Sequence, residues 1–184
     1  MKSAPRTNSA PIRFVIVTLD AHLAGASERA AAALRAEGVN VELTMHVASD
    51  WMRDASTIEP CRADIAKADL IVVTQLFMED QVAAIRDVLA ERADKCDAVM
   101  VALSAAELMR CTRMRGFSMG GQSDNSAWSP MAIMRRMLGG KRTAGSSGER
   151  QMAALRRVPK LLKYVPGTAQ DVRAYYLLMQ YWLA

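Results

Sequence analysis

The sequence predicts an α/β protein: a flavodoxin-like or Rossmann-like parallel sheet with flanking helices, followed by a basic helical C-terminal extension. Two observations carry this prediction. Over the first hundred residues, short apolar runs rich in β-branched side chains alternate with segments of helical periodicity. Strands and helices that alternate at this spacing build a parallel, doubly wound sheet. After Arg110 the alternation stops, and the sequence becomes Gly/Ser-rich and basic.

Four strands are expected in the N-terminal part. Residues 12–19 and 69–74 are apolar runs, typical of strands that are buried on both faces. Residues 39–47 alternate apolar and polar side chains, which indicates an exposed edge strand. Residues 97–103 form the fourth strand. Ligands of such sheets bind beyond the carboxyl ends of the strands, so the loops that follow these four runs are candidate sites.

Helices are expected to connect the strands. Ser27 is placed to cap the first helix and Gly38 to end it. Ser104, with Glu107 three residues later, has the spacing of a capping box and predicts a further helix after the fourth strand. The helices between the strands are expected at residues 28–37, 60–67 and 79–95.

We expect three regions along the chain. Residues 1–115 form the α/β N-terminal domain, and residues 116–148 form a Gly/Ser-rich loop, a Met-rich helix and a linker. Residues 149–184 form a basic and aromatic helical segment, whose last helix starts near Thr168 and leads into absent downstream domains.

The net charge of +5 is unevenly distributed. Residues 1–109 contain 11 Lys and Arg against 16 Asp and Glu, whereas residues 110–184 contain 13 against 3. This asymmetry predicts that the basic part meets an anionic partner. Nucleic acid, lipid headgroups, a carboxylated small molecule and the acidic half of the same chain all fit the charge alone.

Several classes of protein are disfavoured. The N-terminus lacks the apolar core of a signal peptide, and no apolar run is long enough for a transmembrane segment. Neither a dinucleotide fingerprint nor a Walker loop is present, and the basic residues do not interleave with aromatics as in nucleic-acid-binding motifs. Three separated cysteines (Cys61, Cys96 and Cys111) suit reduced thiols in a cytoplasmic protein, and without a C-x-x-C pair no metal site is expected.

The first candidate ligand-binding residues are Asp20 and His22. They belong to a D-x-H-x-x-G pattern in the loop after the first strand, which resembles the cobalamin-binding domains of corrinoid enzymes. In those domains the His ligates cobalt, and the Asp orients its imidazole. A His held by a carboxylate is a good metal ligand in general.

A second pair of candidate ligand-binding residues, Asp50 and Trp51, follows the second strand. Trp51 beside charged residues suits stacking on a planar ligand or filling of a domain interface. His46 is interpreted as a core or surface histidine. With two histidines in the chain, a Cys–His nucleophile has little support, and no catalytic residue is assigned.

Interface candidates lie in the C-terminal part. The basic residues suit phosphate or lipid headgroups, or simply a solvated helix face. The closing apolar and aromatic run needs a surface to cover it, which predicts that the chain is the N-terminal part of a larger protein. The interface candidates are Arg156, Arg157, Lys160, Lys163, Tyr175, Tyr181 and Trp182.

The same C-terminal segment, residues 152–183, closely resembles the large H subunit of magnesium chelatase. Residues 17–22, 76–80 and 104–112 resemble the N-terminal region of that family, whose relatives include the cobaltochelatase large subunits. The resemblance implies (bacterio)chlorophyll biosynthesis, with protoporphyrin IX and Mg²⁺ as substrates. It implies as partners the remainder of the H subunit and the I and D subunits, which use ATP.

The resemblance carries no catalytic motif onto this chain, so we expect the chain to support porphyrin binding or subunit docking and to be inactive as a chelatase by itself. The alternatives are a stand-alone tetrapyrrole- or cobalamin-binding module that uses His22, and a lipid-surface protein that uses the basic segment.

Overall fold

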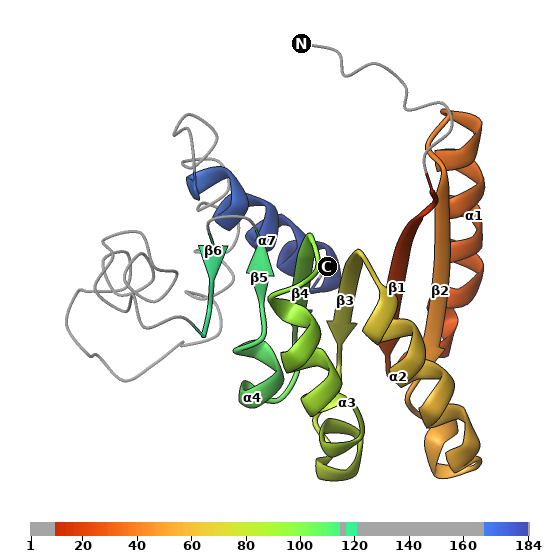
Figure 1. Ribbon diagram of the computed structural model, residues 1–184, viewed down its shortest axis with the longest axis vertical. Coiled ribbons are helices and arrows are strands. Elements are labelled where there is room, and N and C mark those ends of the chain that lie inside the picture. The colour runs from red at the N-terminus through yellow and green to blue at the C-terminus, as the bar shows by residue number, and fades with distance from the viewer. Residues whose placement is uncertain (1–9, 115–116, 121–167, 184) are drawn as a thin grey trace, which may run out of the picture. The chain divides into compact units, whose positions relative to one another are not determined.

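The computed structural model describes residues 10–114, 117–120 and 168–183 (Figure 1). The chain forms two compact units, residues 1–112 and residues 113–184. The Met-rich segment, the linker and the basic run that the sequence singles out lie outside the described residues, so the predicted boundaries at residues 115 and 148 stay predictions.

Four parallel strands form the sheet of the first unit, in the order β2-β1-β3-β4. They are β1 (Ile12–Thr18), β2 (Val41–Val47), β3 (Leu70–Thr74) and β4 (Ala98–Ala102). The α/β class and the parallel sheet are therefore confirmed. β2 is the outer strand, as its alternating pattern predicts. The strands that follow β1 in the sequence lie on both sides of it, so the strand order reverses between β1 and β3.

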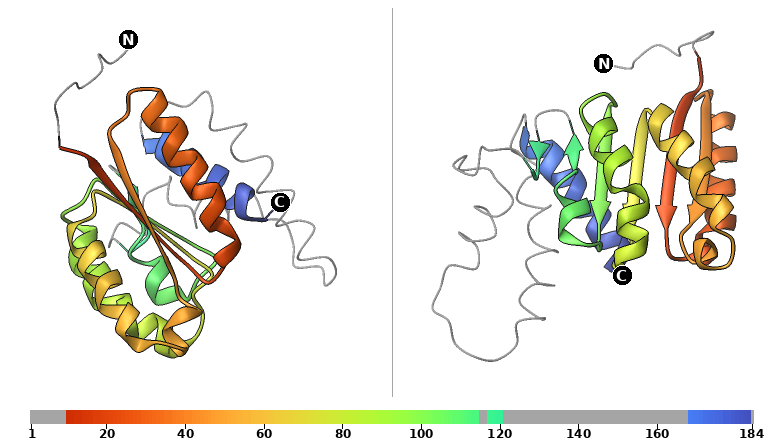
Figure 2. Two further views of the ribbon diagram at one scale, coloured as in Figure 1. Left: turned by 90° about the vertical axis from the view of Figure 1, so that its right-hand side faces the viewer. Right: turned by 60° about the horizontal axis from the view of Figure 1, so that its bottom comes forward.

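Helices cover both faces of this sheet (Figure 2). Helix α1 (Ala24–Ala36) lies on one face, where the Ser27 hydroxyl contacts the sulfur of Met45 at 3.6 Å. Helices α2 (Ile58–Lys67) and α3 (Glu79–Ala93) lie on the other face. Helix α4 (Ala106–Met109) follows β4.

The main core fills the space between the sheet and α2 and α3. Alternate strand residues point toward these helices, as the period of two in a strand requires. The core includes the strand residues Val15, Val17, Ile71, Val73, Val99 and Val101 and the helix residues Ile65, Ile85 and Leu89, all buried.

Two of the predicted helix caps are wrong. α1 begins at Ala24, so Ser27 lies inside the helix, and its hydroxyl donates to the Leu23 carbonyl at 2.9 Å. The Ser104 hydroxyl accepts from the Leu76 amide at 3.2 Å, and it connects two loops instead of capping α4. Gly38 does end α1, with a φ of +80°.

The second unit is described in part. Strands β5 (Arg113–Met114) and β6 (Phe117–Ser118) pair antiparallel, and helix α7 (Thr168–Leu183) begins at the predicted residue. The ring of Tyr175 lies 5.8 Å from that of Phe117, measured between centroids. Among the described residues, no helix combines the length and the hydrophobicity that crossing a membrane requires.

Two glycines near the ends of α1 give a paired stability test. Gly38→Ala places a β-carbon on a left-handed residue and should lower the free energy of unfolding by about 1 kcal/mol. Gly25→Ala should raise it by about 0.5 kcal/mol, because Gly25 is helical and its new β-carbon meets only the movable end of Arg29. Urea unfolding of both variants measures the two changes in the free energy of unfolding. Changes of the same sign in the two variants would contradict this account of the helix ends.

Candidate functional site

The candidate site is the edge of the first unit's sheet where all four strands end. Because the strands are parallel, the loops that follow them meet at this edge, which we call the carboxyl edge. It consists of residues 19–23, 48–57, 75–80 and 103–107. In open α/β sheets the binding crevice lies where the strand order reverses, here between the ends of β1 and β3.

The loop after β1 is held by Asp20. Its carboxylate accepts from the His22 backbone amide at 2.8 Å and caps a short 3₁₀ helix, Ala21–Leu23. The Asp20 amide in turn donates to the Thr18 hydroxyl at 3.1 Å. The described bond of the carboxylate is thus to the backbone of His22, whereas the cobalamin-like interpretation requires one to the imidazole. His22 itself is exposed.

The loops after β3 and β4 share an unusual backbone. Gln75 and Leu103 both follow the last residue of a strand, and both have positive φ, +65° and +48°. The Gln75 amide donates to the Leu103 carbonyl at 2.9 Å, and the Ala105 amide donates to the Leu76 carbonyl at 2.8 Å. Together with the bond from Leu76 to Ser104, these contacts hold the two loops as one rigid element.

This rigid element presents apolar side chains to solvent. Phe77 is 63% exposed and Met78 is 55% exposed, directly after the fully buried Leu76. Leu19, on the loop after β1, is 37% exposed, and Met52, after β2, is 79% exposed. These four residues, which we call the apolar edge cluster, place large apolar groups in the loops after three of the four strands.

The carboxyl-edge loops that carry the apolar edge cluster are rich in acidic residues. Glu107 is paired with Arg86, at 3.7 Å, and the other acids keep the edge negative. In the carboxyl-edge loops Arg53 is the one Lys or Arg. The acidic residues of these loops are Asp20, Asp50, Asp54, Glu79, Asp80 and Glu107.

Two buried polar atoms also lie close to the end of β3 in the chain. They are Oγ1 of Thr74 and Oε1 of Gln81, and neither has a hydrogen-bond partner among the described residues. A buried polar group without a partner costs about 1–3 kcal/mol, so each such group calls for water or a ligand. The sequence offers no signal for either of them.

The two residues of the second predicted pair, Asp50 and Trp51, differ in burial. Both lie in a short 3₁₀ helix, Asp50–Met52, at the carboxyl edge. Asp50 is exposed, but Trp51 is 7% exposed and belongs to the hydrophobic core. The indole therefore fills the core and leaves little surface on which a planar ligand could stack.

A histidine–carboxylate pair that the sequence does not reveal lies on the face of the sheet covered by α2. Nε2 of His46, on β2, lies 2.8 Å from Oδ2 of Asp64, on α2. Cys61 lies one helical turn before Asp64, and burial raises the pKa of its thiol to about 12, with Asp64 adding to the effect. A protonated, buried thiol cannot act as a nucleophile, so the three side chains do not form a catalytic site.

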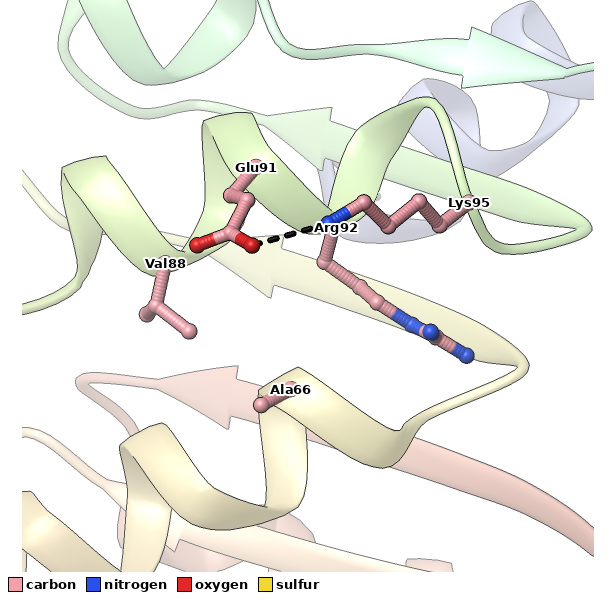
Figure 3. Close-up of a pocket in the computed structure, with 5 residues that line it drawn as sticks. All are labelled: Ala66, Val88, Glu91, Arg92 and Lys95. Atoms are coloured by element: carbon pink, nitrogen blue, oxygen red, sulfur yellow. Dashed lines mark hydrogen bonds and ion pairs between the residues drawn. The ribbon is translucent and has the colours of Figure 1, made fainter.

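Two hollows on this helical face are small. The one in Figure 3, between α2 and α3, measures about 60 Å³, and the charges around it are already paired. Glu91 contacts Lys95 at 2.8 Å, and Arg92 donates to the Ala68 carbonyl. The other hollow measures about 190 Å³ and is lined by Arg13, Val15, Glu42, Thr44, Asp64 and Lys67. Both are below the roughly 300–1,000 Å³ that is typical of ligand pockets.

The predicted interface residues are only partly visible. Arg156, Arg157, Lys160 and Lys163 lie outside the described residues, and so do the side chains of Tyr181 and Trp182. Tyr175 is buried, and burial raises the pKa of its phenol to about 12, with Tyr176 adding to the effect. At least the first rings of the closing aromatic run are therefore sheltered.

A family model described as "Domain of unknown function (DUF3479)" matches residues 13–176. Over 92% of its length the chain is 36% identical to the magnesium-chelatase H subunit of Cereibacter sphaeroides and 33% identical to that of Rhodobacter capsulatus. It is 29% identical, over 98% of its length, to the chloroplastic magnesium-chelatase ChlH protein of Oryza sativa subsp. indica. The chain spans only 13–14% of the length of these relatives. The resemblance to the H subunits of magnesium chelatases is thus confirmed.

The reactivity of the Cys61 thiol tests whether this side chain is buried in the core. With a thiol pKa of about 12 in the folded protein against 9.0 for the ordinary group, the folded state retains a proton that the unfolded state loses above pH 9. The contribution of Cys61 to stability is therefore constant below about pH 9 and declines as the pH rises toward 12. At pH 8 the native thiol should react with iodoacetamide at least a hundredfold more slowly than in urea. Mass spectrometry of the labelled peptide measures both rates, and rapid native labelling would contradict the burial.

Proposed function

The chain belongs to the family described as "Domain of unknown function (DUF3479)", and from this premise we propose that it is a non-catalytic docking domain of a magnesium-chelatase H-type protein. Its carboxyl edge receives a cationic, apolar polypeptide surface from the rest of that assembly. The observation that carries the proposal is the apolar edge cluster, with Phe77 and Met78 on the hydrogen-bonded loops and with acidic residues in the same carboxyl-edge loops.

Burial of the apolar edge cluster supplies the affinity. Full burial of a side chain such as Phe77 or Met78 is worth about 1.5–3 kcal/mol. Because hydrogen bonds already fix the loops after β3 and β4, little conformational entropy is lost when a partner binds. The carboxylates of the same loops select a partner that carries Lys or Arg and repel acidic surfaces.

The same charges favour a polypeptide over a porphyrin as the occupant of this edge. Protoporphyrin IX carries two propionates, which need cationic partners, and Arg53 is the one Lys or Arg in the carboxyl-edge loops. Insertion of Mg²⁺ also needs an enclosed pocket that displaces water from the ion. In the described part of the chain, no three His, Cys, Asp or Glu side chains gather to hold a metal ion. We therefore assign metal insertion to the complete assembly, with ATP used by the I and D subunits.

The partner that we favour is the remainder of an H-type protein. The chain matches about one seventh of each relative, so the relatives contain a large polypeptide beside the matched segment. The basic residues Arg156, Arg157, Lys160 and Lys163 remain candidates for further contacts within such a protein, as do Tyr181 and Trp182.

A second candidate function is tetrapyrrole or cobalamin binding through His22. Its support is the position of this exposed histidine beyond the end of β1, at the point where the strand order reverses. Neutral imidazole is a common metal ligand, and the loop that carries it is fixed by Asp20.

Docking is tested with two leucine-sized residues of equal exposure. Leu19 at the carboxyl edge and Ile12 at the opposite end of β1 are 37% and 38% exposed. The partner is the H subunit of Cereibacter sphaeroides without the segment that matches this chain, and calorimetry measures its binding. Leu19→Ser and Phe77→Ser should each weaken binding about tenfold, equivalent to about 1.4 kcal/mol, while Ile12→Ser should have less than a twofold effect. Equal effects of Leu19→Ser and Ile12→Ser, or no binding by the unaltered chain, would contradict the proposal.

The His22 candidate is tested by titration with protoporphyrin IX and with cobalamin. Ligation through the imidazole predicts a saturable shift of the visible band that His22→Ala abolishes and that a variant of the second histidine, His46→Gln, retains. If neither ligand gives a saturable change at micromolar concentration, this candidate function is excluded and the docking proposal is unaffected.

A further inference from the structure

The outer edge of β2 offers backbone groups for pairing with another strand. The Asn40 carbonyl and the Ala48 amide bond to β1, at 2.9 Å from Ile12 and 2.7 Å from Thr18. Since the backbone groups of a strand alternate in direction, the even-numbered residues of β2 face β1 and the odd-numbered residues face outward. The Arg35 side chain confirms this direction, because its Nε reaches the Val41 carbonyl at 3.4 Å.

Beyond Val41 this edge has no described partner. Among the described residues, no strand and no side chain bonds to the outward amides and carbonyls of Leu43, Met45 and Val47. Proteins usually protect such an edge with Lys, Pro or a bulge. Residues 41–47 contain neither Lys nor Pro, and their register with β1 is continuous from Val41 to Val47. The apolar side chains of Leu43, Met45 and Val47 are only half-buried.

We infer that a second copy of this chain occupies the edge, with the two β2 strands antiparallel about a two-fold axis at Thr44. The pairing follows from self-complementarity. In this register Leu43 forms the hydrogen-bonded pair with Met45 of the other copy, and Thr44 faces Thr44. Glu42 faces His46, so a carboxylate meets an imidazole twice across the interface.

The neighbouring structure is compatible with this arrangement. Nε2 of His46 lies 2.8 Å from Asp64, and this contact fixes the position of the imidazole opposite Glu42 of the second copy. A register moved by four residues would place Glu42 opposite Glu42, and like charges directly opposite destabilise a sheet. Helix α1, on the apolar face of β2, is rich in alanine and presents small side chains there.

Cysteine cross-linking tests the register. In the proposed dimer Thr44→Cys places two sulfur-bearing residues in a non-hydrogen-bonded pair with α-carbons about 4.5 Å apart, within disulfide range. Glu42→Cys is the matched control on the same strand face, because its two copies would be about 14 Å apart. Under mild oxidation Thr44→Cys should give a covalent dimer at least tenfold faster than Glu42→Cys. Equal rates would overturn the inference.

Charge exchange gives a second test, read by sedimentation of the 20.2 kDa chain from about 1 to 200 µM. Thr44→Lys and Thr44→Glu each place two like charges at the axis and should raise the dimer dissociation constant about tenfold. A 1:1 mixture of the two variants should restore dimerisation. Circular dichroism checks that both variants fold. The inference would be overturned if the unaltered chain stayed monomeric over this concentration range, or if the mixture dimerised no more tightly than either variant alone. Neither result would bear on docking at the carboxyl edge.

Discussion

Burial of one face of a parallel sheet is the interaction on which the rest of the first unit depends. Alternate residues of β1, β3 and β4 pack against α2 and α3, and each fully buried Val or Ile contributes about 1.5–3 kcal/mol. Parallel strands require helical crossovers, and crossovers bring every strand end to the same edge. The gathering of Asp20, Phe77 and Leu103 at the carboxyl edge is thus a consequence of how the core is buried, although these residues are far apart in the sequence.

The carboxyl edge combines local strain with rigid support. Left-handed backbone at a residue other than glycine costs of the order of 1–3 kcal/mol, and it occurs here at equivalent positions after two adjacent strands. Hydrogen bonds between the two loops stabilise this conformation. Directly after Gln75, Leu76 is buried, whereas Phe77 and Met78 are exposed to solvent. An exposed apolar group on a fixed backbone suits recognition of a surface.

The sequence predicts the strands well because each pattern reflects how a strand is buried. Alternation of apolar and polar residues indicates burial of one face, and a β-branched apolar run indicates burial of both faces. It fails where a side chain has two possible partners. Ser27 and Ser104 match capping patterns, yet one bonds inside its helix and the other bonds a loop 28 residues away. Trp51 follows a strand as a ligand-binding residue would, but it fills the core. The His46–Asp64 contact joins a strand to a helix, and no local pattern encodes it.

The two proposed surfaces lie on different borders of the sheet and are compatible with each other. The carboxyl edge runs across the strand ends, whereas the β2 edge runs along the strand direction. A two-fold axis through Thr44 makes the two β2 strands antiparallel, so the carboxyl edges of the two copies face opposite ways. Each copy could then hold its own partner without crowding the other. The surfaces also differ in chemistry: mixed polar pairs across β2 favour self-association, and the negative charge of the carboxyl edge opposes it, which directs that edge toward a basic partner.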